Sequence, residues 1–92
     1  MSIVDNVRAK RVTATGALVL GRCRIIGLNV VTGATAGRLT ITDGVGGATL
    51  LDLDTQANTA TYYRLPDDGI LSSSDPAISA LTNITSVTVM VY

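Results

Sequence analysis

Apolar and polar residues alternate along most of this chain, and the alternation predicts β-strands almost throughout. The segment 84–92 shows the pattern most clearly, because Val87, Val89 and Val91 share one face. A period of two is the repeat of a strand, since successive side chains point to opposite faces of a sheet. The candidate segments, two of which are only short pieces, are 7–15, 18–20, 22–31, 38–42, 48–54, 59–65, 70–71, 77–81 and 84–92.

These segments amount to about eight short strands at roughly ten-residue spacing, with turn residues between them. Such spacing is typical of an antiparallel sandwich or barrel. A helical repeat fits only at 75–83, where Asp75 would cap a single turn and Pro76 would open it. We therefore predict an all-β chain that forms one antiparallel, jelly-roll-like β-sandwich domain over residues 1–92.

The segment 22–31 is the longest candidate strand, and it has two apolar faces. Ile26, Leu28 and Val30 share one face, and the opposite face carries further apolar residues around Gly27. Two apolar faces indicate a central strand that is covered on both sides. The glycine in the middle predicts a bend or the close approach of another part of the chain.

Two other residue types yield simple expectations about burial. Tyr62 and Tyr63 are neighbours in a candidate strand and point to opposite faces, so we expect one in the core and the other exposed. Cys23 is the only cysteine, which excludes an internal disulfide. Its apolar neighbours predict that it is buried as a small hydrophobic residue.

The composition is apolar for so small a domain. Hydrophobic residues make up 47% of the chain, charged residues 15%, and the mean hydropathy is +0.42. A typical soluble domain has about 25% charged residues. Because a small domain has little interior, we expect part of the apolar surplus in contacts with other chains. The alternative is that alanine and valine residues are scattered over the surface of a monomer.

The apolar faces of the longest and the last strand are the candidates for contact with a second copy. Both segments carry more apolar residues than one buried face of a strand requires. The predicted self-association residues are Ile26, Leu28, Val30, Val87, Val89 and Val91.

The chain has seven basic and seven acidic residues, so its formal net charge is zero. Balanced charge predicts binding neither to nucleic acid nor to an anionic membrane. Basic residues are concentrated early in the chain and acidic residues later. The two groups either form ion pairs between copies arranged head to tail or are exposed to solvent. The first residues lack the apolar core of a signal peptide, and no apolar stretch approaches the ~18 residues of a membrane span.

Residues that carry catalysis are scarce. The sequence has no histidine and no glutamate, so a catalytic triad or a zinc site has too few members, and we predict no enzyme and no cofactor. Asp52 and Asp54 project from one strand face and, with Asp67 or Asp68, have the oxygen ligands for a calcium ion. Aspartates near turns are more often solvated or hydrogen-bonded turn residues, and we assign no metal site.

Four motifs stand out in the later part of the chain. They are the arginine-containing strand from Arg24 to Val30, the hairpin from Gly37 to Gly44, the Leu-Pro corner from Leu65 to Ile70, and the closing strand from Thr85 to Val89. Together they resemble a recurrent type of small virion protein of tailed bacteriophages, especially those that infect marine bacteria and cyanobacteria. The resemblance extends over residues 20–92, and its motifs are structural rather than catalytic.

The resemblance implies a structural protein on the exterior of a capsid. Such proteins are decoration or cement proteins, which bind the major capsid protein and stabilise the shell. We expect a homo-oligomer, with a trimer favoured because symmetric closure uses one patch repeatedly. For docking we predict the N-terminal arm, residues 1–11, with Arg8, Lys10 and Arg11 meeting acidic shell surface. The first residues of this arm would otherwise be a loose terminus.

A head or tail fibre component that binds the host surface is the alternative within the same resemblance. That function requires an exposed face that carries tyrosine, because sugar recognition relies on aromatic side chains.

Overall fold

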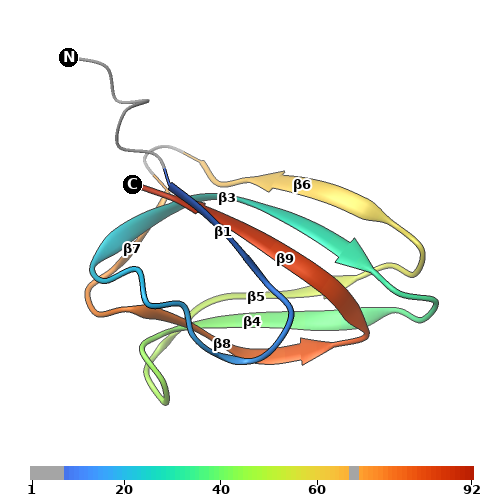
Figure 1. The fold of residues 1–92 in the computed structure, drawn as a ribbon, viewed down its shortest axis with the longest axis horizontal. Helices are drawn as coiled ribbons and strands as arrows, with labels where there is room; N and C mark the ends of the chain where they lie inside the picture. Colours follow the sequence, from blue (N-terminus) through green and yellow to red (C-terminus); the bar gives the residue numbers. More distant parts are fainter. Residues whose placement is uncertain (1–7, 67–68) are drawn as a thin grey trace.

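The computed structural model describes residues 8–66 and 69–92, and these residues form a two-layered β-sandwich (Figure 1). No helix is present in this part of the chain. The strands are β1 (Arg8–Val12), β2 (Gly16–Ala17), β3 (Cys23–Thr32), β4 (Gly37–Asp43), β5 (Thr49–Thr55), β6 (Ala60–Arg64), β7 (Ile70–Ser72), β8 (Pro76–Thr82) and β9 (Ile84–Val91).

The strand order is that of a jelly roll. One sheet has five strands in the order β1-β9-β3-β6, with β7 also paired to β3, and the other has four in the order β2-β8-β4-β5. Since β6 and β7 occupy successive stretches of the same side of β3, they act as one interrupted strand. The pairs β1–β9, β2–β8, β3–β6 and β4–β5 are then nested, as in one long antiparallel hairpin folded over on itself. The predicted all-β, jelly-roll-like sandwich is confirmed.

The core lies between the two sheets and is made of aliphatic side chains. Leu39 and Ile41 of β4 are fully buried, as their alternation predicts. Tyr63 packs against the core while Tyr62 is 54% exposed, so the expectation for this pair is confirmed. Cys23 is buried as predicted, and burial raises the pKa of its thiol. The buried cluster contains Leu18, Cys23, Ile25, Leu28, Val30, Leu39, Ile41, Ile78, Ile84, Val87, Val89 and Val91.

A β-bulge in β3 explains the two apolar faces of this strand. Ile25 lies opposite Val91 and Gly27 lies opposite Met90, so Ile26 is an additional residue in β3. An additional residue reverses which positions face inward. Cys23 and Ile25 therefore face the core before the bulge, and Leu28 and Val30 face it afterwards. β3 is a central strand, as predicted, and the core covers one of its faces; coverage of the other face by a neighbour stays a prediction.

This geometry also corrects the predicted self-association face. Leu28, Val30, Val87, Val89 and Val91 are at most 1% exposed within a single chain. Their side chains lie between the two sheets, so a second copy cannot reach them without opening the sandwich. Ile26, which the bulge turns outward, is the one member of the predicted set that is accessible.

The candidate strand 77–81 is confirmed as part of β8, and two other local expectations are wrong. The segment 75–83 forms strand β8 rather than a helical turn, because it is hydrogen-bonded to both β2 and β4. Segment 18–20 is a loop rather than a strand, although its first residue, Leu18, is buried. In β8, sheet pairing outweighs the local preference for a helical turn.

Candidate functional site

The two sheets carry opposite charge. The four-stranded sheet has a single basic residue, Arg38, and three acidic residues, Asp43, Asp52 and Asp54. The five strands of the other sheet have no acidic residue. Their basic residues are Arg8, Lys10, Arg11, Arg24 and Arg64. The early basic and late acidic halves of the sequence therefore become two oppositely charged layers.

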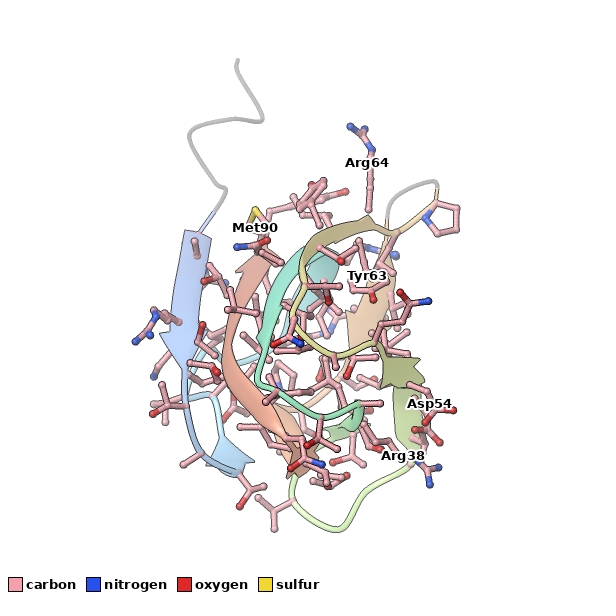
Figure 2. The ribbon with its side chains drawn as sticks, turned by 90° about the vertical axis from the view of Figure 1, so that its right-hand side faces the viewer. Arg38, Asp54, Tyr63, Arg64 and Met90 are labelled. Atoms are coloured by element: carbon pink, nitrogen blue, oxygen red, sulfur yellow. The ribbon has the colours of Figure 1, made fainter. Side chains whose placement is uncertain are left out.

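We call the outward side of the five-stranded sheet the basic face. Its outward side chains include Arg11, Arg24, Ile26, Val31, Tyr62, Arg64 and Met90, together with the polar Asn29 and Thr88. Figure 2 shows Arg64 and Met90 on one side of the sandwich and Arg38 and Asp54 on the opposite side. The basic face thus combines positive charge with half-exposed apolar side chains.

Tyr62 lies flat on the basic face because Gly27 leaves room for it. A Cβ atom at position 27 would come within 2.7 Å of the tyrosine hydroxyl oxygen and 3.1 Å of the ring. The glycine in mid-strand therefore marks both a bulge and a close approach, as the sequence predicted. An aromatic ring that covers a glycine in this way supports the sheet at a position that lacks a side chain.

The predicted docking cations divide between the two sides of β1. Arg8, Lys10 and Val12 lie opposite the buried Val91, Val89 and Val87, so they lie on the inner face of β1, where Lys10 and Val12 are half-buried and Arg8 is exposed. Arg8 donates to the carbonyl oxygen of Leu20 at 3.2 Å, and Lys10 donates to that of Leu18 at 2.6 Å.

These bonds bear on the predicted docking arm. Lys10 is half-buried against its own chain, whereas Arg8 is exposed, and the docking role of both residues stays a prediction. Arg11 points outward and is exposed, so it remains available. Residues 1–7 of the predicted arm lie outside the described residues.

Asp75 holds the loop that follows β2. Its carboxylate accepts hydrogen bonds from the backbone N–H groups of Val19, Leu20 and Gly21, at 2.8, 2.7 and 3.1 Å. Partial burial raises the pKa of Asp75, but these donors outweigh it and leave the pKa below its usual value. The sequence indicated a capping role for this residue, and the structure assigns its carboxylate to a loop more than fifty residues away.

Asp52 of the acidic pair on β5 is bound by two side chains of β4. Arg38 donates to both carboxylate oxygens of Asp52, one bond measuring 2.8 Å, and Thr40 donates to one of them at 3.0 Å. The Arg38 guanidinium lowers the pKa of Asp52 from 3.8 to about 2. Within residues 8–66 and 69–92, no three potential metal-ligating side chains lie together. Asp67 and Asp68 lie outside the described residues.

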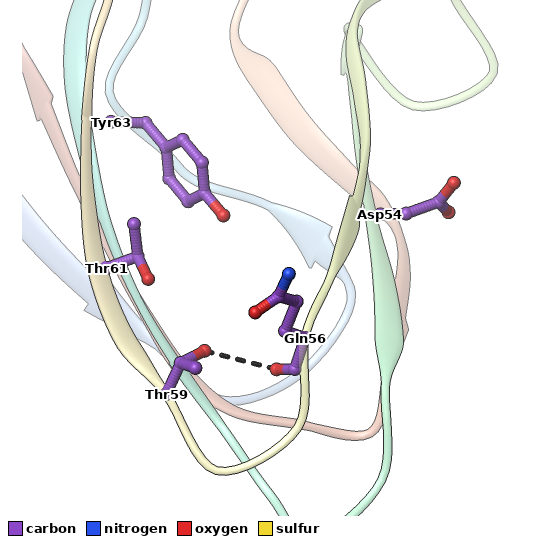
Figure 3. A pocket seen from close by; sticks show the side chains of 5 residues that line it. All are labelled: Asp54, Gln56, Thr59, Thr61 and Tyr63. Atoms are coloured by element: carbon purple, nitrogen blue, oxygen red, sulfur yellow. Dashed lines mark hydrogen bonds between the residues drawn. The ribbon is translucent and has the colours of Figure 1, made fainter.

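An open cleft lies between the edge strands β5 and β6 (Figure 3). Its volume is about 300 Å³, and it is lined by Asp54, Gln56, Thr59, Thr61 and Tyr63. Figure 3 shows that Gln56, Thr61 and Tyr63 point into the space, whereas Asp54 points away. Thr59 donates to the Gln56 carbonyl oxygen at 3.1 Å and holds the turn. The cleft therefore offers uncharged hydroxyl and amide groups beside an aromatic ring.

The cleft between β5 and β6 is not among the sites predicted from the sequence. Alternation along 59–65 places Thr61 and Tyr63 on one face, but nothing local indicates that Gln56 lies across from them. The signal is the polar threonine on the inward face of β6, at a position where an enclosed core would favour an apolar residue.

Comparisons with known proteins found no match: no family model, no curated protein and no solved structure matches this chain. Among the described residues, no helix has the length and apolar character needed to cross a membrane. By its fold, this protein is a small antiparallel β-sandwich with the strand order of a jelly roll.

Proposed function

We propose that this protein is a structural component of a tailed-bacteriophage virion, a capsid decoration or cement protein on the exterior of the shell. The observation that carries the proposal is the basic face. It is broad, it has positive charge and half-exposed apolar side chains, and its strands hold no acidic residue. The motif resemblance to small virion proteins supports the same function.

The size of the molecule suits a contact repeated over a shell. A specific interface buries about 1,600 Å² in total, or about 800 Å² on each partner. The exposed surface of the chain is 5083 Å², so one face of the sandwich is large enough for such a contact. The proposed partner is the major capsid protein, with an acidic surface that meets Arg11, Arg24 and Arg64.

Charge reversal on the basic face tests this docking. We expect that Arg11→Glu combined with Arg24→Glu weakens binding to heads at least tenfold at low salt, because both charges then repel an acidic surface. Wild-type binding should also weaken as salt rises. Cosedimentation with heads of the parent phage, stripped of this protein, measures the affinity.

The matched control is Arg38→Glu, which reverses a charge on the opposite sheet. We expect its binding to stay within about threefold of the wild type. If the double variant binds like the wild type at low salt, the basic face is not the docking surface. If the wild-type protein fails to bind the heads, the cement function itself is wrong.

The cleft supports a second candidate function, a head or tail fibre component that binds the host surface. Sugar hydroxyl groups are bound by uncharged hydrogen-bonding side chains next to an aromatic ring, and Gln56, Thr61 and Tyr63 supply both. The copy number in intact particles separates the two functions. A cement protein gives a 9.5 kDa band that corresponds to hundreds of copies, and a fibre component gives tens or fewer.

A variant in the cleft tests the second function. We expect Gln56→Ala to weaken binding of host-surface glycans at least fivefold, because it removes a hydrogen-bonding group from an exposed side chain with little effect on the fold. Thr49→Ala, an exposed change at the start of β5, should leave binding unchanged. Titration calorimetry with purified host polysaccharide measures both. Absence of any wild-type binding rejects the fibre function.

A further inference from the structure

The edge strands of the sandwich differ in how they are protected from pairing with another chain. Inward-pointing charges, short length, bulges and exposed like charges are the common protections. β1 has Arg8 and Lys10 turned inward, and β2 is two residues long. β5 has a bulge and the exposed Asp52 and Asp54. β6 has no bulge and no inward-pointing charge, and its single charged residue, Arg64, stands at its end.

The open side of β6 presents a regular row of backbone groups. Thr32 N–H donates to the Thr59 carbonyl at 2.8 Å, and Leu65 N–H donates to the Ile26 carbonyl at 3.1 Å. Alternate residues of an antiparallel strand bond to the same neighbour, so positions 59, 61, 63 and 65 bond to β3. Ala60, Tyr62 and Arg64 therefore direct their N–H and C=O groups away from β3. Within the described ranges, no strand pairs with that side.

We propose that β6 pairs antiparallel with β6 of a second copy about a two-fold axis at Tyr62. In this register Tyr62 lies opposite Tyr62 of the other copy, and Ala60 lies opposite Arg64. All outward N–H and C=O groups of these three residues then have partners. A shift by two residues in either direction leaves one end of the row unpaired, so the register is specified by the strand itself.

The side chains are compatible with this register. Tyr62 is 54% exposed and its ring lies over Gly27 of β3, away from the open side of β6, so it does not obstruct a second strand there. Arg64 meets the small Ala60, so no like charges oppose each other. A two-fold contact at Asp52 of β5, in contrast, would place two carboxylates face to face. The second copy is therefore the occupant that the open side of β6 fits.

The contact joins the five-stranded sheets of two copies into one continuous sheet. It is isologous and closes as a dimer, which differs from the trimer expected on the basis of the resemblance. The inference does not depend on the virion function, because it concerns the isolated protein in solution.

Disulfide trapping tests the register. In a Cys23→Ala background, we expect Tyr62→Cys to form a covalent dimer under mild oxidation, because directly opposed Cα atoms lie about 5.5 Å apart. Ala60→Cys alone should not, since its two copies lie about 13 Å apart along the strands. Ala60→Cys combined with Arg64→Cys should form the dimer again. The readout is a non-reducing gel, and trapping of Ala60→Cys as readily as Tyr62→Cys overturns the register.

The solution mass tests the contact without a new cysteine. We expect light scattering to give twice 9.5 kDa for the wild type, and at least tenfold weaker dimerisation for Tyr62→Pro, which removes an outward N–H together with the ring over Gly27. Circular dichroism should show that Tyr62→Pro remains folded, whereas Thr61→Pro, which removes an N–H bonded to β3, should lower the melting temperature. A wild-type monomer at millimolar concentration, or a trimer, overturns the proposal.

Discussion

Replacing Leu28 with alanine is expected to lower the free energy of unfolding by about 2–5 kcal/mol. Leu28 is fully buried between the two sheets, and core side chains generally relax only partly into the space that such a change leaves. A domain of 92 residues has a total stability of about 5–14 kcal/mol at the usual value per residue. The change therefore removes a large part of the stability. Urea denaturation at pH 7 measures the difference.

The matched control is Ile26→Ala, two residues earlier on the same strand. Without the bulge, residues 26 and 28 would share a face and both changes would have similar effects. Because the bulge turns Ile26 outward, we expect its truncation to cost less than about 1 kcal/mol. Equal costs for the two variants would show that the inward face of β3 is assigned incorrectly.

Replacing Asp75 with alanine is expected to lower the free energy of unfolding by about 3 kcal/mol at pH 7, because three backbone donors lose a charged acceptor. The loop that bears Leu18 into the core then keeps the bond from the Leu18 N–H to the Pro76 carbonyl at 3.0 Å but loses the three bonds to Asp75. Chemical denaturation measures the loss. An unchanged midpoint and slope would contradict the role given to this carboxylate.

The same contact has a defined pH dependence. The pKa of Asp75 is lower in the folded protein than its ordinary 3.8. The stabilisation is therefore complete above pH 3.8 and is lost as the pH falls through the lower folded value. We expect Asp75→Ala to reduce the acid-induced loss of stability. Part of the loss should remain in the variant, because Asp52 has a pKa lowered to about 2 by Arg38.

The apolar composition has a different meaning once the fold is known. Among the described residues, the exposed large hydrophobic side chains are Val19, Val45 and Tyr62. Val19 and Val45 stand in loops, and Tyr62 stands on an edge strand. The jelly roll buries most of the larger apolar residues within one chain, so composition by itself does not locate a contact. The proposed contacts are therefore inferred from the open edge of β6 and from the charge of the basic face.

The two proposed surfaces are compatible on one molecule. The basic face is the outward side of the five-stranded sheet, and the self-pairing edge is the free side of β6 within the same sheet. A dimer through β6 would place two basic faces in one continuous surface and double the area offered to a shell. Loss of dimerisation in Tyr62→Pro and loss of docking in the charge-reversal variant are separate measurements, so each proposal can fail alone.

The sequence by itself determined the strands and much of their facing. Alternation placed Leu39 and Ile41 together in the core and put Tyr62 and Tyr63 on opposite faces, and the strand spacing indicated a jelly-roll-like sandwich. These features depend on local periodicity, because a strand with one buried face must repeat every two residues.

Only the tertiary structure decided which of the two faces is buried and which distant groups meet. A single additional residue at Ile26 reverses the faces of β3, and periodicity does not reveal it because both faces are apolar there. The partners of Arg8, Lys10 and Asp75 lie on other segments, and the cleft needs Gln56 to lie across from β6. Such contacts form because the packing of two sheets brings together residues that are distant in the sequence. The local alternation of apolar and polar residues does not indicate which distant segments will meet.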